Sequence, residues 1–417
     1  MDDSRQRSRA SWFIAYTLFM VMVGPNVPSP LYELYHKNWH LSAAMITLLF
    51  ATYPLVLLPC LLLVGPLSDR VERRTILVPG LIVAEAGSIC FALAHAIAWL
   101  FVARALQGLA VGSTIGTLTA MLVELHPQQL RREAPVLASL TVAAGGAVGP
   151  VLAGLLAQYA PYPTSLPYMV HLLLLMPTLL GVWMMPKTIP RQPGRQKRPI
   201  PSSRLSVLNG SPFALGSVTA FVAWAVIALF VALAPTYVAI FLHVQDLMVI
   251  GGVVFLLLGA STVTQALLRE LPAQRAIVTG IVLLLLGLGS VIIAVPMHSL
   301  ALLLAGMIAN GIGHGLAWMG SLAFVTLTAP SSRRGEILAR FYVVMYLGVG
   351  LPVIGVGFLT AWIGLYGAIA FFAGTVGIMG VSLAVFISKV PPECIAPCRT
   401  AGESEDHPDK RWRGENR

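Results

Sequence analysis

The stretch FVARALQGLAVGS, residues 101–113, places a single arginine inside a long apolar segment. No acidic residue lies within fifteen positions of Arg104 on either side. A cation at the centre of a bilayer costs several kcal/mol, about 2.5–3.5 kcal/mol on insertion scales. Arg104 therefore requires a partner elsewhere in the chain, and its presence in an apolar segment suggests a structural or functional role.

The composition is that of a protein surrounded by lipid. Of the 417 residues, 57% are hydrophobic and 11% are charged, whereas a soluble domain has about 25% charged residues. A net charge of +10 would suggest nucleic acid as the partner of a soluble protein. Here the basic residues occur in short blocks between apolar runs, and the sequence has no nucleic-acid-binding motif. We therefore expect a lipid bilayer, not nucleic acid, as the partner of this surface.

The apolar runs predict an all-α integral membrane protein. A membrane-spanning helix needs about 20 apolar residues, and runs of this length are too continuous for the strands of a β-barrel. The sequence contains twelve such runs, at approximately 11–33, 43–64, 76–96, 98–123, 135–158, 166–186, 212–236, 247–268, 276–296, 299–328, 340–362 and 364–389.

The distribution of lysine and arginine predicts the orientation, because cytoplasmic loops are enriched in both. With both termini in the cytoplasm, every lysine and arginine except Lys37 and Arg104 lies on the cytoplasmic side. The proline-rich, basic stretch 187–211 cannot form a packed core and separates six spans from six. We expect a multi-pass protein of the cell (inner) membrane with an N-terminal half at 1–186, a cytoplasmic linker at 187–211, a C-terminal half at 212–390 and a disordered cytoplasmic tail at 391–417.

The connection between the second and third spans, GPLSDRVERRT at 65–75, is a candidate cytoplasmic gate. Gly65 permits a tight exit from the second span, and Asp69 is suited to a helix N-terminus, where the dipole favours a carboxylate. Three arginines are spaced to pair with acids on the cytoplasmic face: Arg70, Arg73 and Arg74.

The fourth span has a polar face. Arg104, Gln107 and Thr114 share one side of a helix, and lipid offers such groups no partners. Beside this face runs a ridge of small residues suited to close helix contact, formed by Gly108, Gly112 and Gly116.

Glu85 is the candidate partner of Arg104, because it is the only carboxylate deep within a predicted span. Counting from the turn between the third and fourth spans, the two residues differ in depth by about 4 Å. A buried pair is therefore feasible. Two interpretations stay open, namely a proton relay and a static bridge between the two spans; full proton-coupled transport in a Glu85→Gln variant would exclude the relay.

The fifth span contains GGAVGPVLAG at 145–154. Pro150 removes a helix hydrogen bond and introduces a kink, while small residues allow two backbones to approach. We predict a bendable helix at the interface of the halves, based on Gly145, Gly149, Pro150 and Gly154.

The tenth span carries a polar and aromatic stripe at i, i+4 and i+8. Its histidine is suited to accept a proton or to hydrogen-bond a substrate, although a neutral histidine bonded to a neighbouring helix fits equally well. Aromatic residues with a polar group suit a partly aromatic, amphipathic substrate. The predicted substrate cavity consists of Asn26, Arg104, Gln107, Thr114, Trp224, Tyr237, Asn310, His314 and Trp318.

Three of these segments resemble elements of the major facilitator superfamily, namely 65–74, 104–112 and 145–154. The resemblance covers about residues 11–390 and is greatest to the twelve-span drug:proton antiporters and sugar-efflux-like permeases. It implies two six-helix halves around a central cavity lined by spans one, four, seven and ten. It also implies a role for the 65–74 cluster in latching the inside gate, and for 145–154 in export. The chain departs from the family pattern at Glu72 and Ala153, where glycine is usual.

The sequence has no P-loop, no metal-ligand spacing and no Ser/His/Asp set, so we expect neither an enzyme nor a bound metal or cofactor. The predicted function is secondary active transport, with proton-coupled efflux of small lipophilic or cationic compounds by alternating access. Two alternatives remain, a proton-coupled uptake permease and an exporter of sugars or other organic solutes. The resemblance implies a small-molecule substrate, protons as partners and a monomer; substrate, direction and coupling ion stay open.

Overall fold

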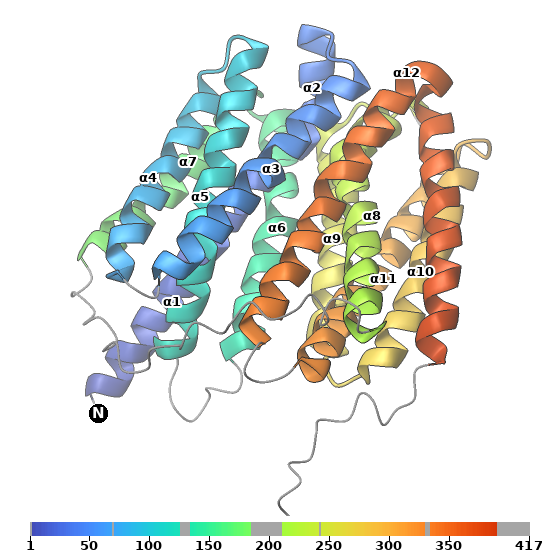
Figure 1. Ribbon diagram of the computed structural model, residues 1–417. Helices are drawn as coiled ribbons and strands as arrows, with labels where there is room; N and C mark the ends of the chain where they lie inside the picture. The colour runs from blue at the N-terminus through green and yellow to red at the C-terminus, as the bar shows by residue number, and fades with distance from the viewer. Residues whose placement is uncertain are drawn as a thin grey trace, which may run out of the picture.

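The structure is a computed structural model that describes residues 2–68, 71–125, 134–184, 211–241, 243–329 and 334–389. Residues 187–210 of the predicted linker (187–211) and the predicted tail at 391–417 lie outside the described residues, and Ser211 is the first residue of a helix. Within them the chain forms long, roughly antiparallel helices (Figure 1). Asp69 and Arg70 of the candidate gate also lie outside the described residues.

The N-terminal half begins with a broken span, in which a 3₁₀ turn, η1 (Gly24–Asn26), separates α1 (Asp2–Val23) from α2 (Pro28–Trp39). The remaining helices of this half are α3 (Ala43–Ser68), α4 (Arg73–Ala92), α5 (Ile97–Leu125), α6 (Ala134–Tyr159) and α7 (Leu166–Met184). The prediction of a tight exit at Gly65 was wrong, because α3 continues through this glycine to Ser68.

The C-terminal half consists of α8 (Ser211–Phe241), α9 (Leu247–Leu267), α10 (Ala273–Ala294), α11 (Leu300–Thr328) and α12 (Arg334–Ser388). The Asp246 carboxylate caps α9 by accepting from the backbone N–H groups of Met248 and Val249, which satisfies donors that a helix start leaves free.

Eleven segments of the described chain are long and apolar enough to cross a membrane. The last of them contains two crossings, because the backbone of α12 is non-helical at Gly364, with φ 72° and ψ 169°. Glycine adopts a positive φ without the steric cost that a Cβ brings. With α1, η1 and α2 as one span, the described chain makes twelve crossings, and the predicted all-α membrane fold is confirmed.

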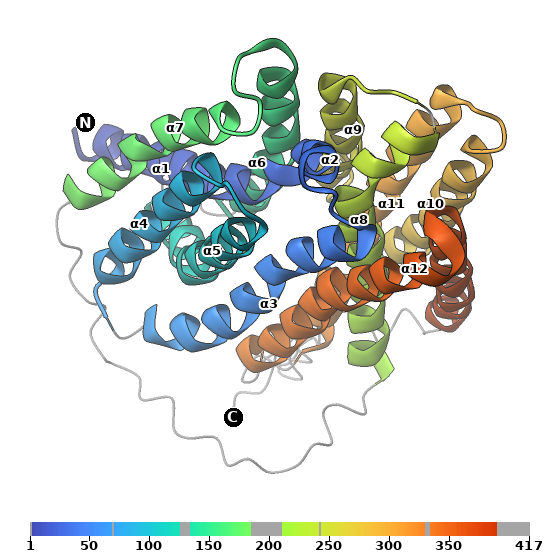
Figure 2. The same cartoon turned by 90° about the horizontal axis from the view of Figure 1, so that it is seen from above.

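The two halves meet along two pairs of helices. Seen from above, α6 lies beside α9, and α3 lies beside α12 (Figure 2). Small residues allow these backbones to approach, as at Gly251 of α9, where an added Cβ would overlap the carbonyl oxygen of Pro150 in α6. We use "α2 end" for the end of the bundle where α2 joins α3 and α8 joins α9, and "N-terminal end" for the opposite end (Figure 1).

Candidate functional site

Arg104 binds the break in the first span. Its Nη1 donates to the carbonyl oxygen of Pro25 at 2.7 Å and to Oε1 of Gln107 at 3.0 Å, and its Nη2 donates to the Tyr32 hydroxyl. Its guanidinium carbon also lies 5.7 Å from the ring centroid of Phe50, and 1% of the residue is exposed. Carbonyl dipoles and aromatic faces therefore surround a fully buried cation.

Gln107 completes this contact, because its Nε2 donates to the carbonyl oxygen of Gly24 at 2.9 Å. Pro28 has no N–H and cannot donate to this carbonyl, four residues before it, as a helical residue would. The C-terminal end of α1 also carries the negative end of the helix dipole, which favours a nearby cation. The backbone N–H of Val27 reaches the same carbonyl at 3.3 Å, so Gln107 adds a second donor at Gly24, while Arg104 binds the carbonyl of Pro25.

The predicted ion pair between Glu85 and Arg104 is absent from this structure. The hydrogen-bond partners of Arg104 are Pro25, Gln107 and Tyr32, and none is a carboxylate. Oε1 of Glu85 is buried without a hydrogen-bond partner. The prediction failed because it considered only carboxylates as partners and overlooked backbone carbonyls as a source of negative charge.

The C-terminal half holds a second buried cluster, around His314 of α11. Nδ1 of His314 lies 2.8 Å from Oγ of Ser261 on α9, and its ring centroid lies 4.9 Å from that of Trp224 on α8. Trp224 also packs edge-on against Trp318 at 5.5 Å, and Trp318 stacks on Phe341 of α12 at 5.7 Å. The structure therefore brings three predicted cavity residues together, namely Trp224, His314 and Trp318.

A polar chain links this cluster to a cavity at the N-terminal end. Nε2 of Gln265 donates to Oγ of Ser261 at 3.1 Å, and Oε1 of Gln265 accepts from Oγ of Ser139 in α6 at 3.5 Å. The cavity has a volume of about 220 Å³ and lies between the halves. Its described lining residues are Ser139, Leu140, Gln265, Arg269, Leu271, Met319, Gly320 and Ala323.

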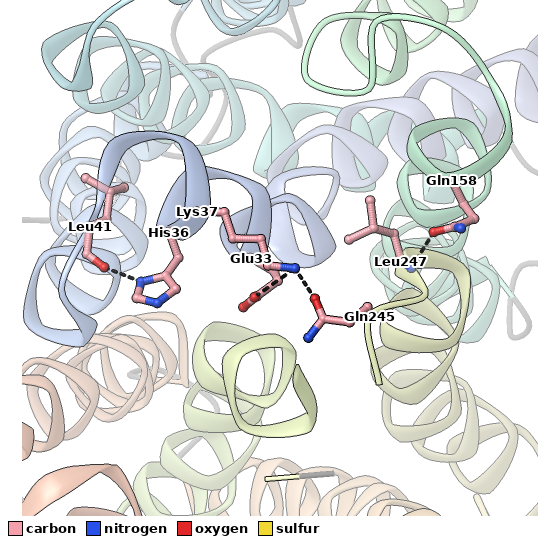
Figure 3. Close-up of polar contacts among 7 residues, drawn as sticks. All are labelled: Glu33, His36, Lys37, Leu41, Gln158, Gln245 and Leu247. Atoms are coloured by element: carbon pink, nitrogen blue, oxygen red, sulfur yellow. Dashed lines mark hydrogen bonds and ion pairs between the residues drawn. The ribbon is translucent and has the colours of Figure 1, made fainter. Parts of the chain in front are cut away.

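The halves make direct polar contacts at the α2 end (Figure 3). Nζ of Lys37 on α2 contacts Oε1 of Gln245, which precedes α9, and lies 3.5 Å from Oε1 of Glu33. The backbone N–H of Leu247 donates to Oε1 of Gln158 in α6 at 2.8 Å. We call Glu33, Lys37, Gln158, Gln245 and Leu247 the α2-end latch.

Three predicted cavity residues face elsewhere in this conformation. Thr114 bonds to the carbonyl of Ala110 in its own helix and packs against Gly80 of α4. The Tyr237 hydroxyl donates to the carbonyl of Val291 in α10 at 2.7 Å. Asn310 likewise packs against α10. Helical spacing predicted polar faces for Thr114 and Asn310, and residue type suggested Tyr237, but the neighbouring helix that each side chain meets depends on tertiary packing.

Asn26 lies in the break itself, and its Nδ2 donates to the carbonyl of Met22 at 3.2 Å. An added Cβ at Gly149 of α6 would lie 3.0 Å from Cβ of Asn26, and one at Gly145 would lie 2.6 Å from the carbonyl oxygen of Phe19. At Gly154 an added Cβ would instead overlap the carbonyl oxygen of Leu247. The 145–154 segment therefore packs its first glycines on the broken first span and its last glycine on the other half.

The described gate arginines bind within their own half. Nη2 of Arg73 lies 2.5 Å from Oε1 of Glu124 at the end of α5, and the guanidinium of Arg74 lies 5.7 Å from the ring centroid of Trp183 in α7. The gate function of this segment stays a prediction, as do the hinge function of 145–154 and the substrate function of the cavity residues.

Several residues of these sites were missed from the sequence, including Tyr32, Ser261, Gln265 and Lys37. One available signal was GPNVPSP at 24–30, where three prolines free carbonyl groups within an apolar span.

His171 of α7 links three spans, because it contacts Oγ of Ser88 in α4 at 2.9 Å and the carbonyl of Met20 in α1 at 3.0 Å. Its two ring nitrogens are satisfied, as expected of a structural histidine.

Twelve membrane crossings in two packed halves, with buried polar clusters in both halves and a cavity between them, define a membrane transport protein. The chain belongs to the Major Facilitator Superfamily, whose family model matches residues 13–301. Membership of this family agrees with two predictions from the sequence, namely the fold and a transporter instead of an enzyme.

Two groups of curated relatives match part of the chain. The chain is 23% identical over 147 residues to the quinolone resistance protein NorA of Staphylococcus aureus, a match that covers 35% of this chain and 38% of NorA. It is 28% identical over 185 residues to the inner membrane transport protein YajR of Escherichia coli, covering 43% of this chain and 39% of YajR. The chain thus spans less than half of the length of these relatives.

Two solved structures share the fold over nearly the whole chain. One is a bacterial homologue of the human lysosomal transporter Spinster in an inward-facing and occupied conformation, with a TM-score of 0.76, 14% identity, and coverage of 93% of this chain and 98% of that one. The other is the nucleoside transporter NupG, with a TM-score of 0.73, 11% identity, and coverage of 90% and 99%.

Proposed function

We propose that this protein exports small lipophilic or cationic compounds in exchange for protons, by alternating access between the two sides of the cell (inner) membrane. The observation that carries the proposal is the difference between the two ends of the bundle. Backbone and side-chain contacts join the halves at the α2 end, whereas a cavity of about 220 Å³ lies between them toward the N-terminal end. Such an asymmetry is expected of one state of a carrier that rocks its halves around a central site.

The orientation in the proposal follows from charge. The N-terminal end carries Arg73, Arg74, Arg269 and Arg275 of the described chain, and the α2 end carries Lys37. Cytoplasmic connections are enriched in lysine and arginine, so the N-terminal end is assigned to the cytoplasm. The conformation is then open toward the cytoplasm and closed toward the outside.

Two carboxylates are candidates for proton coupling, the buried Glu33 and the half-buried Glu85. Glu33 has 3% of its side chain exposed, and its Oε2 has no hydrogen-bond partner. Glu85 likewise has a buried oxygen without a partner. Acids within membrane spans are rare and commonly serve ion or proton transfer. Glu33 is the stronger candidate, because it adjoins Lys37 of the α2-end latch and its charge state acts directly on the contact between the halves.

Efflux is favoured over the alternatives by the lining of the central helices. The cluster at His314 is aromatic, with Trp224, Trp318 and Phe341 in contact, and such side chains suit apolar substrates that carry a polar group. The name of NorA, a resistance protein, points in the same direction. A proton-coupled uptake permease and a sugar or organic-solute exporter remain the second candidates, since the same fold serves both.

Everted membrane vesicles test the proposal. The vesicles are energised to acid inside, monitored with a pH-sensitive dye, and challenged with lipophilic cations, neutral aromatic compounds, sugars and organic acids. Dye recovery on addition of one class demonstrates proton antiport and identifies that class. Vesicles with an Arg104→Ala variant of verified folding serve as the control. Absence of recovery with every compound, from protein shown to be folded, would contradict proton-coupled efflux.

A further inference from the structure

The cluster around His314 contains two buried nitrogens that have no hydrogen-bond partner. They are Nε2 of His314 and Nε1 of Trp224. The two rings lie with their centroids 4.9 Å apart at an interplanar angle of 88°, and 3% of His314 is exposed. Buried polar atoms normally have a partner, so two such atoms on adjacent rings need an explanation.

The hydrogen bonds of Ser261 determine which nitrogen of His314 carries hydrogen. Oγ of Ser261 accepts from Nε2 of Gln265 at 3.1 Å and lies 2.8 Å from Nδ1 of His314. Other hydroxyls in this helix donate to a carbonyl of the previous turn, as Thr262 and Thr264 do. For Ser261 the acceptor within reach among its described contacts is Nδ1 of His314, and we assign the hydroxyl hydrogen to it. Nδ1 is then the acceptor, and the hydrogen of a neutral ring is on Nε2.

His314 and Trp224 therefore present two N–H donors from adjacent rings. An indole nitrogen is a donor only, and the Nε2 tautomer gives His314 the same role. The apolar surroundings are supplied by Trp318, which packs against Trp224 at 5.5 Å, and by Phe341, which stacks on Trp318 at 5.7 Å. A ligand at this site requires a hydrogen-bond acceptor and a flat apolar body.

Access to the cluster and its charge restrict the ligand further. Gln265, which holds Ser261, lines the cavity at the N-terminal end, as do Met319 and Gly320 beside Trp318. Among the described lining residues the charged one is Arg269, and none is acidic. A permanent cation would find no carboxylate among these lining residues and would meet the positive charge of Arg269. An uncharged acceptor such as a carbonyl oxygen has two lone pairs for the two donors.

We propose that Trp224 and His314 bind the acceptor oxygen of an uncharged, planar aromatic substrate, with Ser261 as the positioning residue that fixes the tautomer of His314. This assignment rests on the proposed export function and narrows its substrate class from lipophilic or cationic compounds to neutral aromatic compounds with a carbonyl-type acceptor. The test compares 9-fluorenone with fluorene, which has the same three-ring skeleton but lacks the carbonyl oxygen.

The measurement is saturable binding of each tritiated compound to the purified full-length protein in nanodiscs. We expect fluorenone to bind more tightly than fluorene. Loss of one donor in Trp224→Phe or His314→Phe should weaken fluorenone binding by about three- to tenfold, while fluorene binding changes by less than about twofold. Trp362→Phe and His95→Phe, at exposed positions far from the cluster, are the matched controls and should change neither.

Ser261→Ala separates positioning from packing. It should weaken fluorenone binding in the otherwise unchanged protein and have no further effect in a His314→Phe background, because the tautomer then no longer matters. Equal binding of the two compounds, equal losses for both in the variants, or stronger displacement by tetraphenylphosphonium than by unlabelled fluorenone would overturn the assignment.

The outcomes also separate this assignment from the export function on which it rests. Proton-coupled export in the vesicles with unaltered fluorenone binding in Trp224→Phe and His314→Phe would overturn the assignment and leave the export function standing. Donor-dependent fluorenone binding without dye recovery for any compound would support the binding site and contradict proton-coupled efflux.

Discussion

Nη1 of Arg104 in α5 donates to the carbonyl oxygen of Pro25 at 2.7 Å, across the break in the first span. A helix interrupted inside a bilayer exposes carbonyl groups that lipid cannot satisfy. Arg104 and Gln107 satisfy two of them, at Pro25 and Gly24. The buried cation and the broken helix therefore stabilise each other, and each accounts for the presence of the other in an apolar environment.

We expect Gln107→Leu to lower the free energy of unfolding by about 1–3 kcal/mol, because one buried N–H of Arg104 loses its acceptor. The carbonyl of Gly24 then keeps only the backbone N–H of Val27, at 3.3 Å. The leucine preserves most of the volume, so packing contributes little. Unfolding of the purified protein in mixed micelles, followed by circular dichroism, measures the loss. Thr375→Ala, an exposed residue that bonds only to its own helix, is the control. An unchanged stability would mean that the break does not depend on the side-chain amide of Gln107.

Glu85→Gln should change the free energy of unfolding by less than about 0.5 kcal/mol. Removing one partner of a buried ion pair costs about 3–5 kcal/mol, but Glu85 has no such partner in this structure. The same unfolding measurement distinguishes an unpaired Glu85 from one in an ion pair. A loss of several kcal/mol would show that Glu85 does pair with Arg104. Transport by this variant separately tests the proton relay: full proton-coupled activity excludes Glu85 from that role.

The helices of this protein can be predicted from the sequence, whereas the partners of its buried polar residues depend on tertiary packing. Hydropathy and length predict the helices, because lipid requires about 20 apolar residues for each crossing. The partners of Arg104 depend instead on backbone carbonyls, which the sequence indicates only indirectly, through the prolines at 24–30 that free carbonyl groups within the span. Thr114 shares a polar helix face with Arg104 and Gln107, yet it contacts α4, and Asn310, in the stripe with His314 and Trp318, contacts α10. The neighbouring helix that packs against a given polar face depends on the tertiary structure, and it cannot be predicted from the pattern of residues in a single sequence.

Gly154→Val should weaken closure of the halves at the α2 end. Its Cβ would overlap the carbonyl oxygen of Leu247 in α9, and overpacking of this kind costs about 1–3 kcal/mol. We expect a lower unfolding temperature and slower transport in the vesicle assay. Gly116→Ala is the matched control, because an added Cβ there has no atom within 4 Å; it should be neutral or slightly stabilising, since alanine favours helix. Equal effects of the two variants would show that the contact at Gly154 is not specific.

Lys37→Gln should loosen the α2-end latch, because Lys37 contacts both Glu33 in its own helix and Gln245 in the other half. A partly exposed contact of this type is worth about 0.2–1 kcal/mol, so the population open at the α2 end should rise about 1.5- to 5-fold. The measurement uses a reporter Asn26→Cys, in a background with the four native cysteines replaced. An impermeant maleimide is added from the α2 side, and the labelling rate reports opening.

Lys389→Gln is the control for the charge change, since Lys389 is exposed at the opposite end of the bundle. It should leave the labelling rate unchanged. Glu33→Gln should raise the rate in the same direction as Lys37→Gln, because it removes the carboxylate that holds the ammonium group beside Gln245. If protonation of Glu33 drives opening, lowering the pH on the α2 side should accelerate labelling in the unaltered protein and have no effect in Glu33→Gln. Acceleration that persists in Glu33→Gln would assign the proton to another group.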